Sequence, residues 1–187
     1  MMNPTPEQFE LISSVMYEPL SYIHTDYSVL ASKEDNTVWQ KLANRELIQQ
    51  YQFINKLDCN IDHVVEKIFT HWELLPRCAL FLGYFYSRQA LLLSDNYYQL
   101  EPPLKSFLSL YPVINIDKET TLSLKDIEPI SIGYQLLFNF ITSISMALSQ
   151  RFTLLFAPQS STIVLPKSLI LSRSLFLLVL DYAALTA

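Results

Sequence analysis

Two cysteines and two histidines lie close together in the sequence and are the side chains best suited to chemistry. Cys59, His63, His71 and Cys78 are all potential zinc ligands. On one helix, His63 and His71 would stand eight residues apart, which is about 12 Å at a rise of about 1.5 Å per residue. That separation is too large for one ion, although a pair formed by Cys59 and His63 keeps a compatible spacing. We therefore predict no metal site and no cofactor.

Other kinds of catalysis receive little support from the sequence. The 187 residues include only two glycines, Gly83 and Gly133, whereas phosphate-binding loops, dinucleotide folds and the nucleophile elbow depend on glycine. The many serines stand in no Gly-x-Ser-x-Gly motif, and most acidic residues stand singly on polar faces. We expect no catalytic residues and no enzymatic activity.

Charge and composition limit the class of protein. The formal net charge is −5, from 13 Lys and Arg against 18 Asp and Glu, and the basic residues are scattered, which disfavours nucleic-acid binding. The first ten residues lack the pattern of a signal peptide, and two cysteines make no disulfide framework. The apolar stretches 74–93 and 169–185 are each interrupted by charges, so we expect core helices rather than membrane spans. These features predict a cytoplasmic protein.

Hydrophobic periodicity predicts a mainly α fold, a compact helical domain of about six helices. Thr5, Pro6 and Gln8 form the start signal of the first helix. An apolar stripe from Ile61 to Trp72 marks the third. The predicted helices cover residues 6–18, 36–57, 61–72, 77–93, 131–150 and 166–184, with a further short helix around 104–108.

Within these helices, the pattern also assigns positions to the core. The second helix is expected to bury apolar positions that include Val38, Leu42, Tyr51 and Ile54. Gly83 falls inside the fourth helix, where it costs about 1 kcal/mol relative to alanine. We expect a neighbouring helix to approach closely there, the alternative being that Gly83 caps one helix before another begins.

The segment between Pro112 and Pro129 breaks the helical pattern. Alternating residues predict a small β-hairpin near 113–124. The chain is therefore expected to form a single helical domain over 1–187, or two subdomains of about 1–111 and 130–187 joined by 112–129.

Tyrosine and tryptophan are more numerous than a core of this size requires, and both are common in protein interfaces. The candidates are Tyr17, Tyr22, Tyr27, Trp39, Tyr84, Tyr86, Tyr97 and Tyr98. Taken together, they favour a protein that binds a partner.

Four blocks of sequence carry a resemblance to a known family. They are YEPLSYIH at 17–24, LPRCALFLG at 75–83, SIGY at 131–134 and LSQRFTLLFAP at 148–158. Their order and spacing resemble the OrgA/MxiK (SctK) family of bacterial type III secretion systems. The likeness covers about residues 11–158 and extends weakly over 175–183.

The resemblance implies a non-enzymatic, mainly helical adaptor of the sorting platform. In this family the adaptor joins the C-ring-like pod protein to the cytoplasmic domain of the inner-membrane ring protein, and the pods lead on to the secretion ATPase complex. It implies a role in protein transport and virulence, at the cytoplasmic face of the inner membrane and without a membrane span. Partner-contact candidates from the first and last blocks are Tyr17, Leu20, Tyr22, His24, Arg151, Phe152 and Phe156.

Two other functions stay open at this point. One is a helical chaperone or regulator that binds a segment of a secreted substrate in an apolar groove. The other is a metal-dependent or hydrolytic enzyme, supported only by the cluster of cysteines and histidines.

Overall fold

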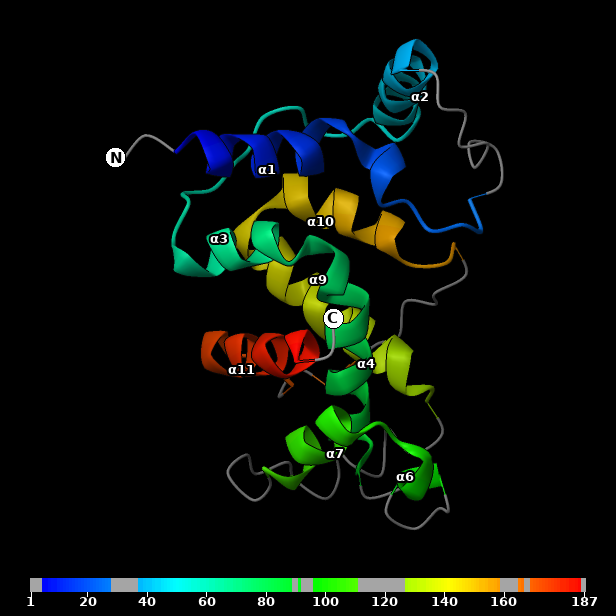
Figure 1. Cartoon of the computed structure of the whole chain (residues 1–187), viewed down its shortest axis with the longest axis vertical. Helices are drawn as coiled ribbons and strands as arrows, with labels where there is room; N and C mark the ends of the chain where they lie inside the picture. The colour runs from blue at the N-terminus through cyan, green and yellow to red at the C-terminus, as the bar shows by residue number, and fades with distance from the viewer. Residues whose placement is uncertain are drawn as a thin grey trace. The chain divides into compact units, whose positions relative to one another are not determined.

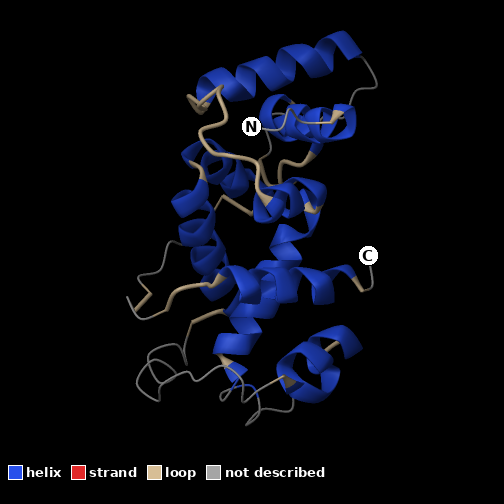
Figure 2. Cartoon of the chain, turned by 90° about the vertical axis from the view of Figure 1, so that its left-hand side faces the viewer, coloured by secondary structure: helices blue, strands red, loops and turns tan. Residues whose placement is uncertain are grey.

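The fold is seen in a computed structural model of the chain (Figure 1), which describes residues 5–27, 37–88, 91, 96–110, 127–158, 165–166 and 169–185. Within these residues, the regular elements are nine α-helices and three short 3-10 helices, and Figure 2 colours all of them as helix. The mainly α class is confirmed, but the expected count of about six helices was too low. The hairpin predicted near 113–124 lies outside the described residues.

The chain divides into two compact units, each assembled from two separate stretches. Unit 1 consists of Met1–Glu73 and Ile141–Ser160, and unit 2 consists of Leu74–Phe140 and Ser161–Ala187. The predicted division into 1–111 and 130–187 stays a prediction, and residues 111–126 of its joining segment lie outside the described part of the chain.

Unit 1 is built around α1, which lies against α2, α3 and α10 (Figure 1). The bounds of its helices are α1 Pro6–Tyr17, η1 Pro19–Ser21, α2 Thr37–Gln50, α3 His63–Thr70, α10 Met146–Phe152 and η3 Thr153–Leu155. The short helix η2 (Trp72–Leu74) ends at the first residue of unit 2. The start of α1 agrees with the sequence: Gln8 N donates to Thr5 Oγ1 at 3.2 Å, and Thr5 N donates to Gln8 Oε1 at 2.9 Å. These two bonds form the predicted capping box and satisfy two N–H groups at the helix end.

Helix α3 also follows its apolar pattern. Val64, Val65, Ile68 and Phe69 are buried, as is Trp72 in the turn that follows. The helix begins after Asp62, whose Oδ1 accepts a hydrogen bond from Val65 N at 3.0 Å. The predicted stripe is therefore confirmed, except that Ile61 lies before the helix and is exposed.

Helix α2 differs from its prediction in length and in the face that it buries. It ends at Gln50 rather than near residue 57, because Gln52 has a φ of 52°, a left-handed conformation that does not continue an α-helix. Its buried side chains are Ala43 and Leu47. Val38 and Leu42, which we expected in the core, are 65% and 61% exposed; Tyr51 and Ile54, which follow the helix, are exposed as well.

The predicted helix 131–150 is two helices, α9 (Pro129–Ile144) and α10. Ser145 separates them with extended backbone angles, φ −155° and ψ 124°. Its Oγ accepts from Leu148 N at 3.1 Å and donates to Oδ1 of Asp58, whose Oδ2 accepts from Met146 N at 3.0 Å. A carboxylate far away in the sequence thus caps the start of α10 and favours a helix beginning there.

Unit 2 consists of α4 (Leu75–Tyr86), α6 (Asn96–Gln99), α7 (Pro102–Ser109), most of α9, and α11 (Arg173–Ala184). Helices α4, α7 and α11 contact one another. The core is rich in phenylalanine; Phe107 contacts the Phe81 and Phe85 rings, with centroid distances of 5.9 and 5.5 Å. Helix α11 begins at Arg173 rather than near Pro166, since Ser172 caps it through a bond from Leu175 N.

Helices α4 and α9 approach each other through the chain's two glycines. A Cβ atom built on Gly83 would lie 2.9 Å from Cα of Pro129 and still closer to its carbonyl group. One built on Gly133 would lie 2.8 Å from Cα of Ala79. The predicted close approach at Gly83 is confirmed, and the alternative of a helix cap is wrong because α4 continues to Tyr86. Since Ala79 precedes Gly83 and Pro129 precedes Gly133 by four residues, the two pairs fit antiparallel helices.

Candidate functional site

All seven predicted partner-contact residues lie in unit 1, in two segments that the fold brings together. His24 N donates to Leu154 O at 2.7 Å, and Tyr27 Oη donates to Thr153 O at 3.4 Å. The first and last blocks of the sequence therefore form one neighbourhood. Their side chains divide into a buried group and a surface group.

Arg151 is the centre of the buried group and is fully inaccessible to solvent. Its Nε donates to Met16 O at 3.0 Å, and its Nη1 donates to Ile54 O at 3.0 Å and to Ala147 O at 2.9 Å. The Phe53 ring lies against the guanidinium, 5.0 Å from Cζ to the ring centroid. Burial lowers the pKa of Arg151, yet arginine stays protonated at neutral pH. The side chain ties α1, α10 and the segment after α2 to one another.

Three aromatic candidates pack in the same unit as this arginine. Phe152 and Phe156 are buried and pack together with ring centroids 4.9 Å apart. Tyr22 donates from Oη to Val15 O at 2.8 Å and packs edge to face on Trp72 at 5.6 Å. Burial raises the pKa of Tyr22, opposed by the charge of Arg151. In this structure these three aromatic side chains support the core of unit 1, and their role as partner contacts stays a prediction.

The other three candidates are accessible to different degrees. Tyr17 is 49% exposed and donates from Oη to Asn55 O at 2.9 Å. Leu20 is half-buried, and its N donates to Asn44 Oδ1 at 2.8 Å. His24 is half-buried, and its Nδ1 accepts from Asp26 N at 3.2 Å. Tyr17 has the most accessible side chain of the three.

A groove of about 500 Å³ opens beside Tyr17 in unit 1. One wall is the end of α1, the other is α2, and Asn55 contributes from the segment that follows. Its lining residues are Tyr17, Glu18, Lys41, Asn44, Arg45, Ile48, Gln49 and Asn55. Most of these residues are polar and both signs of charge occur among them, but most of the surface that lines the groove is apolar. The groove therefore suits a partner segment that carries both apolar and charged side chains.

The sequence prediction missed the exposed face of α2 that borders this groove. Val38 and Leu42 lie on that face together with Arg45 and Gln49, which are also exposed. The sequence signal for this face is that Val38, Leu42, Arg45 and Gln49 recur every three to four residues. The same spacing is typical of a helix face that packs on the core, so it did not reveal that this face is exposed.

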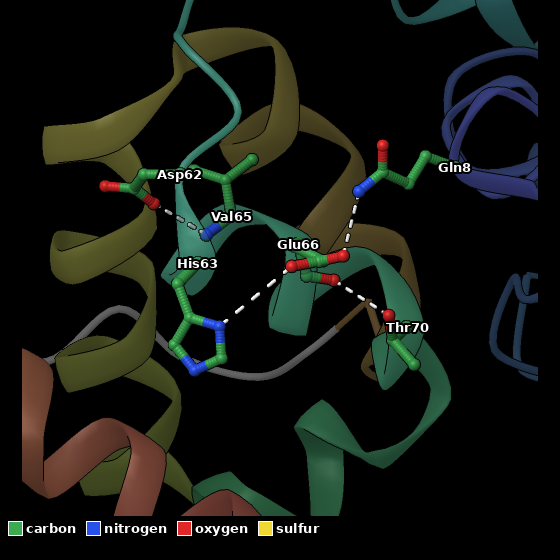
Figure 3. A network of polar contacts seen from close by, with 6 residues as sticks. All are labelled: Gln8, Asp62, His63, Val65, Glu66 and Thr70. Atoms are coloured by element: carbon green, nitrogen blue, oxygen red, sulfur yellow. Dashed lines mark hydrogen bonds and ion pairs between the residues drawn. The ribbon is translucent and has the colours of Figure 1, made fainter. Parts of the chain in front are cut away.

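A second polar network links α1 to α3 through Glu66 (Figure 3). Gln8 Nε2 donates to Glu66 Oε1 at 2.8 Å, and His63 Nδ1 lies 4.0 Å from Glu66 Oε2. Thr70 Oγ1 donates to the Glu66 carbonyl at 2.9 Å. Glu66 therefore links α3 to α1 through Gln8, whereas the exposed His63 lies near Glu66 on α3 itself.

Cys59, His63, His71 and Cys78, the potential zinc ligands, form no metal-binding cluster in the described part of the chain. No three His, Cys, Asp or Glu side chains are grouped there in a way that could hold a metal ion. Cys59 is half-buried, Cys78 is buried, and neither of these two described residues is in a disulfide. Burial raises the pKa of the Cys78 thiol to about 12, so this thiol is not activated as a nucleophile.

Comparison with known proteins decides the family. The profile of the bacterial type III secretion apparatus proteins OrgA and MxiK matches residues 12–185, nearly the whole chain. The chain belongs to the OrgA/MxiK family. This OrgA/MxiK match continues through α11, beyond the blocks at 17–158 that carried most of the resemblance. No curated protein and no solved structure matched the sequence.

Membership of the OrgA/MxiK family makes this protein a component of a bacterial type III secretion apparatus. As such it is expected to contact other components of the apparatus. Over the residues that the structure describes, this OrgA/MxiK protein has no helix both long and apolar enough to cross a membrane.

Proposed function

We propose that this protein is a non-enzymatic adaptor that joins the pod protein of the sorting platform to the cytoplasmic domain of the inner-membrane ring protein. The observation that carries the proposal is its membership of the OrgA/MxiK family over residues 12–185. As such an adaptor it acts in the cytoplasm, against the inner membrane, and connects indirectly with the secretion ATPase complex.

The surface of unit 1 supports this proposal. Tyr17 is an exposed tyrosine beside a groove, and Leu42 is an exposed leucine on the adjoining helix. Exposed aromatic and aliphatic side chains next to a polar rim are common in protein interfaces. The alternative function, a chaperone for a secreted substrate, is less favoured because the family that matches the chain is one of secretion apparatus proteins.

Binding and secretion assays test the adaptor role. The purified protein is expected to form one complex with the pod protein and another with the cytoplasmic domain of the ring protein. A strain that lacks the gene should fail to assemble the platform and to secrete. Binding to neither partner, together with normal secretion in the deletion strain, would refute the proposal. Capture of a secreted substrate by the protein alone would instead favour the chaperone.

A further inference from the structure

The exposed face of α2 in unit 1 has the spacing of a helix-binding seam. Val38, Leu42, Arg45 and Gln49 follow one another at intervals of four, three and four residues, as do the positions that face a partner in a coiled coil. Val38 and Leu42 are 65% and 61% exposed, and Arg45 and Gln49 are also exposed. Val38 and Gln49 are eleven residue steps apart, which is about 16 Å of helix at about 1.5 Å per residue.

The seam is continuous with the groove beside Tyr17, because Arg45 and Gln49 belong to both. Lys41, another groove residue, lies one turn before Arg45 on α2. A partner that covered Val38 and Leu42 could therefore extend into the groove and reach Tyr17. An apolar stripe that continues into a groove with apolar surface and charged side chains fits an amphipathic helix.

The charges on this face indicate the sign of the charge expected on the partner's contact surface. Lys41 and Arg45 are both exposed and stand four residues apart, where like charges destabilise a helix. Glu18 is the one acidic residue of the groove lining, so the groove carries a positive excess although the whole chain has a net charge of −5. Carboxylates from a partner would offset this local repulsion.

We infer that the α2 seam and the adjoining groove bind an acidic amphipathic helix of another component of the secretion apparatus. Its apolar side chains cover Val38 and Leu42, and its carboxylates face Lys41 and Arg45. A second copy of this chain is a poorer occupant, since two such seams would bring their basic residues together. The inference rests on the adaptor function proposed above and assigns one of its contact surfaces.

Two variants of α2 test the assignment, with the pod protein and the cytoplasmic domain of the ring protein as separate probes. Leu42→Asp adds a negative charge to the seam, and Arg45→Glu replaces a positive charge at position 45 with a negative one. Ile170→Asp is the matched control, because Ile170 is 78% exposed and belongs to unit 2. Circular dichroism and thermal melting establish that each full-length variant is folded.

Both α2 variants are expected to weaken binding to one of the two probes by at least about tenfold, an effect equal to about 1.4 kcal/mol. The control should bind as the wild type does. Wild-type binding should weaken with salt, and Arg45→Glu should reduce that dependence. Folded α2 variants that bind both probes normally would overturn this assignment and leave the adaptor proposal intact. A wild-type protein that binds neither probe would overturn both.

Self-association provides the last arm of the test. Analytical ultracentrifugation of the wild type should show no dimer that depends on Leu42. A dimer lost in Leu42→Asp, with binding to both probes unchanged, would identify a second copy as the occupant and overturn the inference.

Discussion

Arg151 carries a positive charge into the interior of unit 1, and its neighbours compensate for part of the lost hydration, since Nε and Nη1 donate hydrogen bonds whereas the buried Nη2 has no hydrogen-bond partner. Desolvating a charged group is costly unless hydrogen bonds replace the lost water. Three carbonyl oxygens accept from this guanidinium, and the Phe53 ring lies over it. The planar fork of arginine reaches Met16 and Ile54 from one side chain, whereas the ammonium of lysine is a point charge on a flexible stem. Arg151 therefore acts as a clamp, in the sense that its hydrogen bonds hold together segments that are distant in sequence.

Replacing Arg151 should destabilise unit 1. Arg151→Met removes the donors of Met16 O and Ile54 O, and unsatisfied acceptors together with lost charge-assisted bonds are expected to cost on the order of 3–5 kcal/mol. Arg151→Lys keeps the positive charge but loses the planar guanidinium. Its free energy of unfolding should lie between those of Arg151→Met and the wild type. Urea unfolding measures both differences.

The exposed Lys56 offers a control in the same unit. Lys56→Ala should change the free energy of unfolding by less than about 0.5 kcal/mol. If Arg151→Met unfolds at the wild-type urea concentration but loses partner binding, Arg151 is a contact residue rather than a clamp.

Among the elements, α10 is capped at its start by the adjoining Ser145 and also by Asp58, a residue distant in the sequence. Asp58 accepts from Ser145 Oγ, Met146 N and, at 3.4 Å, Ala147 N. Burial alone would raise the pKa of the Asp58 carboxyl, but these hydrogen bonds outweigh it and lower the pKa below 3.8. The charged form is therefore stabilised by folding.

The capping role of Asp58 predicts a pH-dependent stability. Asp58→Asn should lower the free energy of unfolding at pH 7 by about 0.5–1 kcal/mol, a value at the low end for helix caps because the carboxylate is exposed. Since the folded-state pKa is depressed, the wild-type advantage is complete well above pH 3.8 and disappears as the pH falls through the folded pKa. Urea titrations from pH 7 to pH 2 measure this difference.

The exposed Asp181 of α11 serves as the comparison. Asp181→Asn should not reproduce the loss at pH 7. If the difference in free energy of unfolding between Asp58→Asn and the wild type stayed constant down to pH 2, capping by the charged carboxylate would be contradicted.

The crossing of α4 and α9 depends on the absence of two Cβ atoms. Gly83→Ala gains about 1 kcal/mol of helix propensity, but its methyl group meets the backbone of Pro129, which cannot rotate away as a side chain could. Overpacking of this kind costs about 1–3 kcal/mol or more. We therefore expect a net loss of stability in Gly83→Ala and a similar loss in Gly133→Ala, both measured by thermal and urea unfolding.

A side chain larger than alanine at position 83 tests the close packing of α4 on α9 more strictly. Gly83→Leu should fail to fold normally, whereas Ser106→Ala, at an exposed position of α7, should have little effect. A Gly83→Leu variant with the wild-type melting temperature would contradict the close packing of α4 on α9.

At the scale of the whole molecule, unit 1 requires two stretches that are far apart in the sequence. Arg151 comes from Ile141–Ser160, while its acceptors Met16 O and Ile54 O come from Met1–Glu73. Cutting the chain at 112–129 would separate these partners. The fragments 1–111 and 130–187 are thus expected to lack cooperative thermal unfolding when purified alone and to regain it when mixed. Independent cooperative folding of both fragments would instead support the division into two subdomains.

Much of the secondary structure was predictable because its causes are local. The capping box of Thr5 and Gln8 and the stripe of α3 depend on residues within one or two helical turns. The close approach at Gly83 was also predictable, since a glycine inside a helix costs stability that packing must offset. The four blocks at 17–24, 75–83, 131–134 and 148–158 together led to the family, although not to the positions of their side chains.

By itself, the sequence determined the helical class, the start of α1, the core face of α3 and the membership of a secretion-apparatus family. Only the tertiary structure decided that Val38 and Leu42 face outward, that α10 begins after Ser145 and that Arg151 is buried. The physical reason is the same in each case. Periodicity shows that a helix has an apolar face, but neighbours distant in sequence, such as Asp58 for α10 and Met16 for Arg151, determine which groups lose their contact with water.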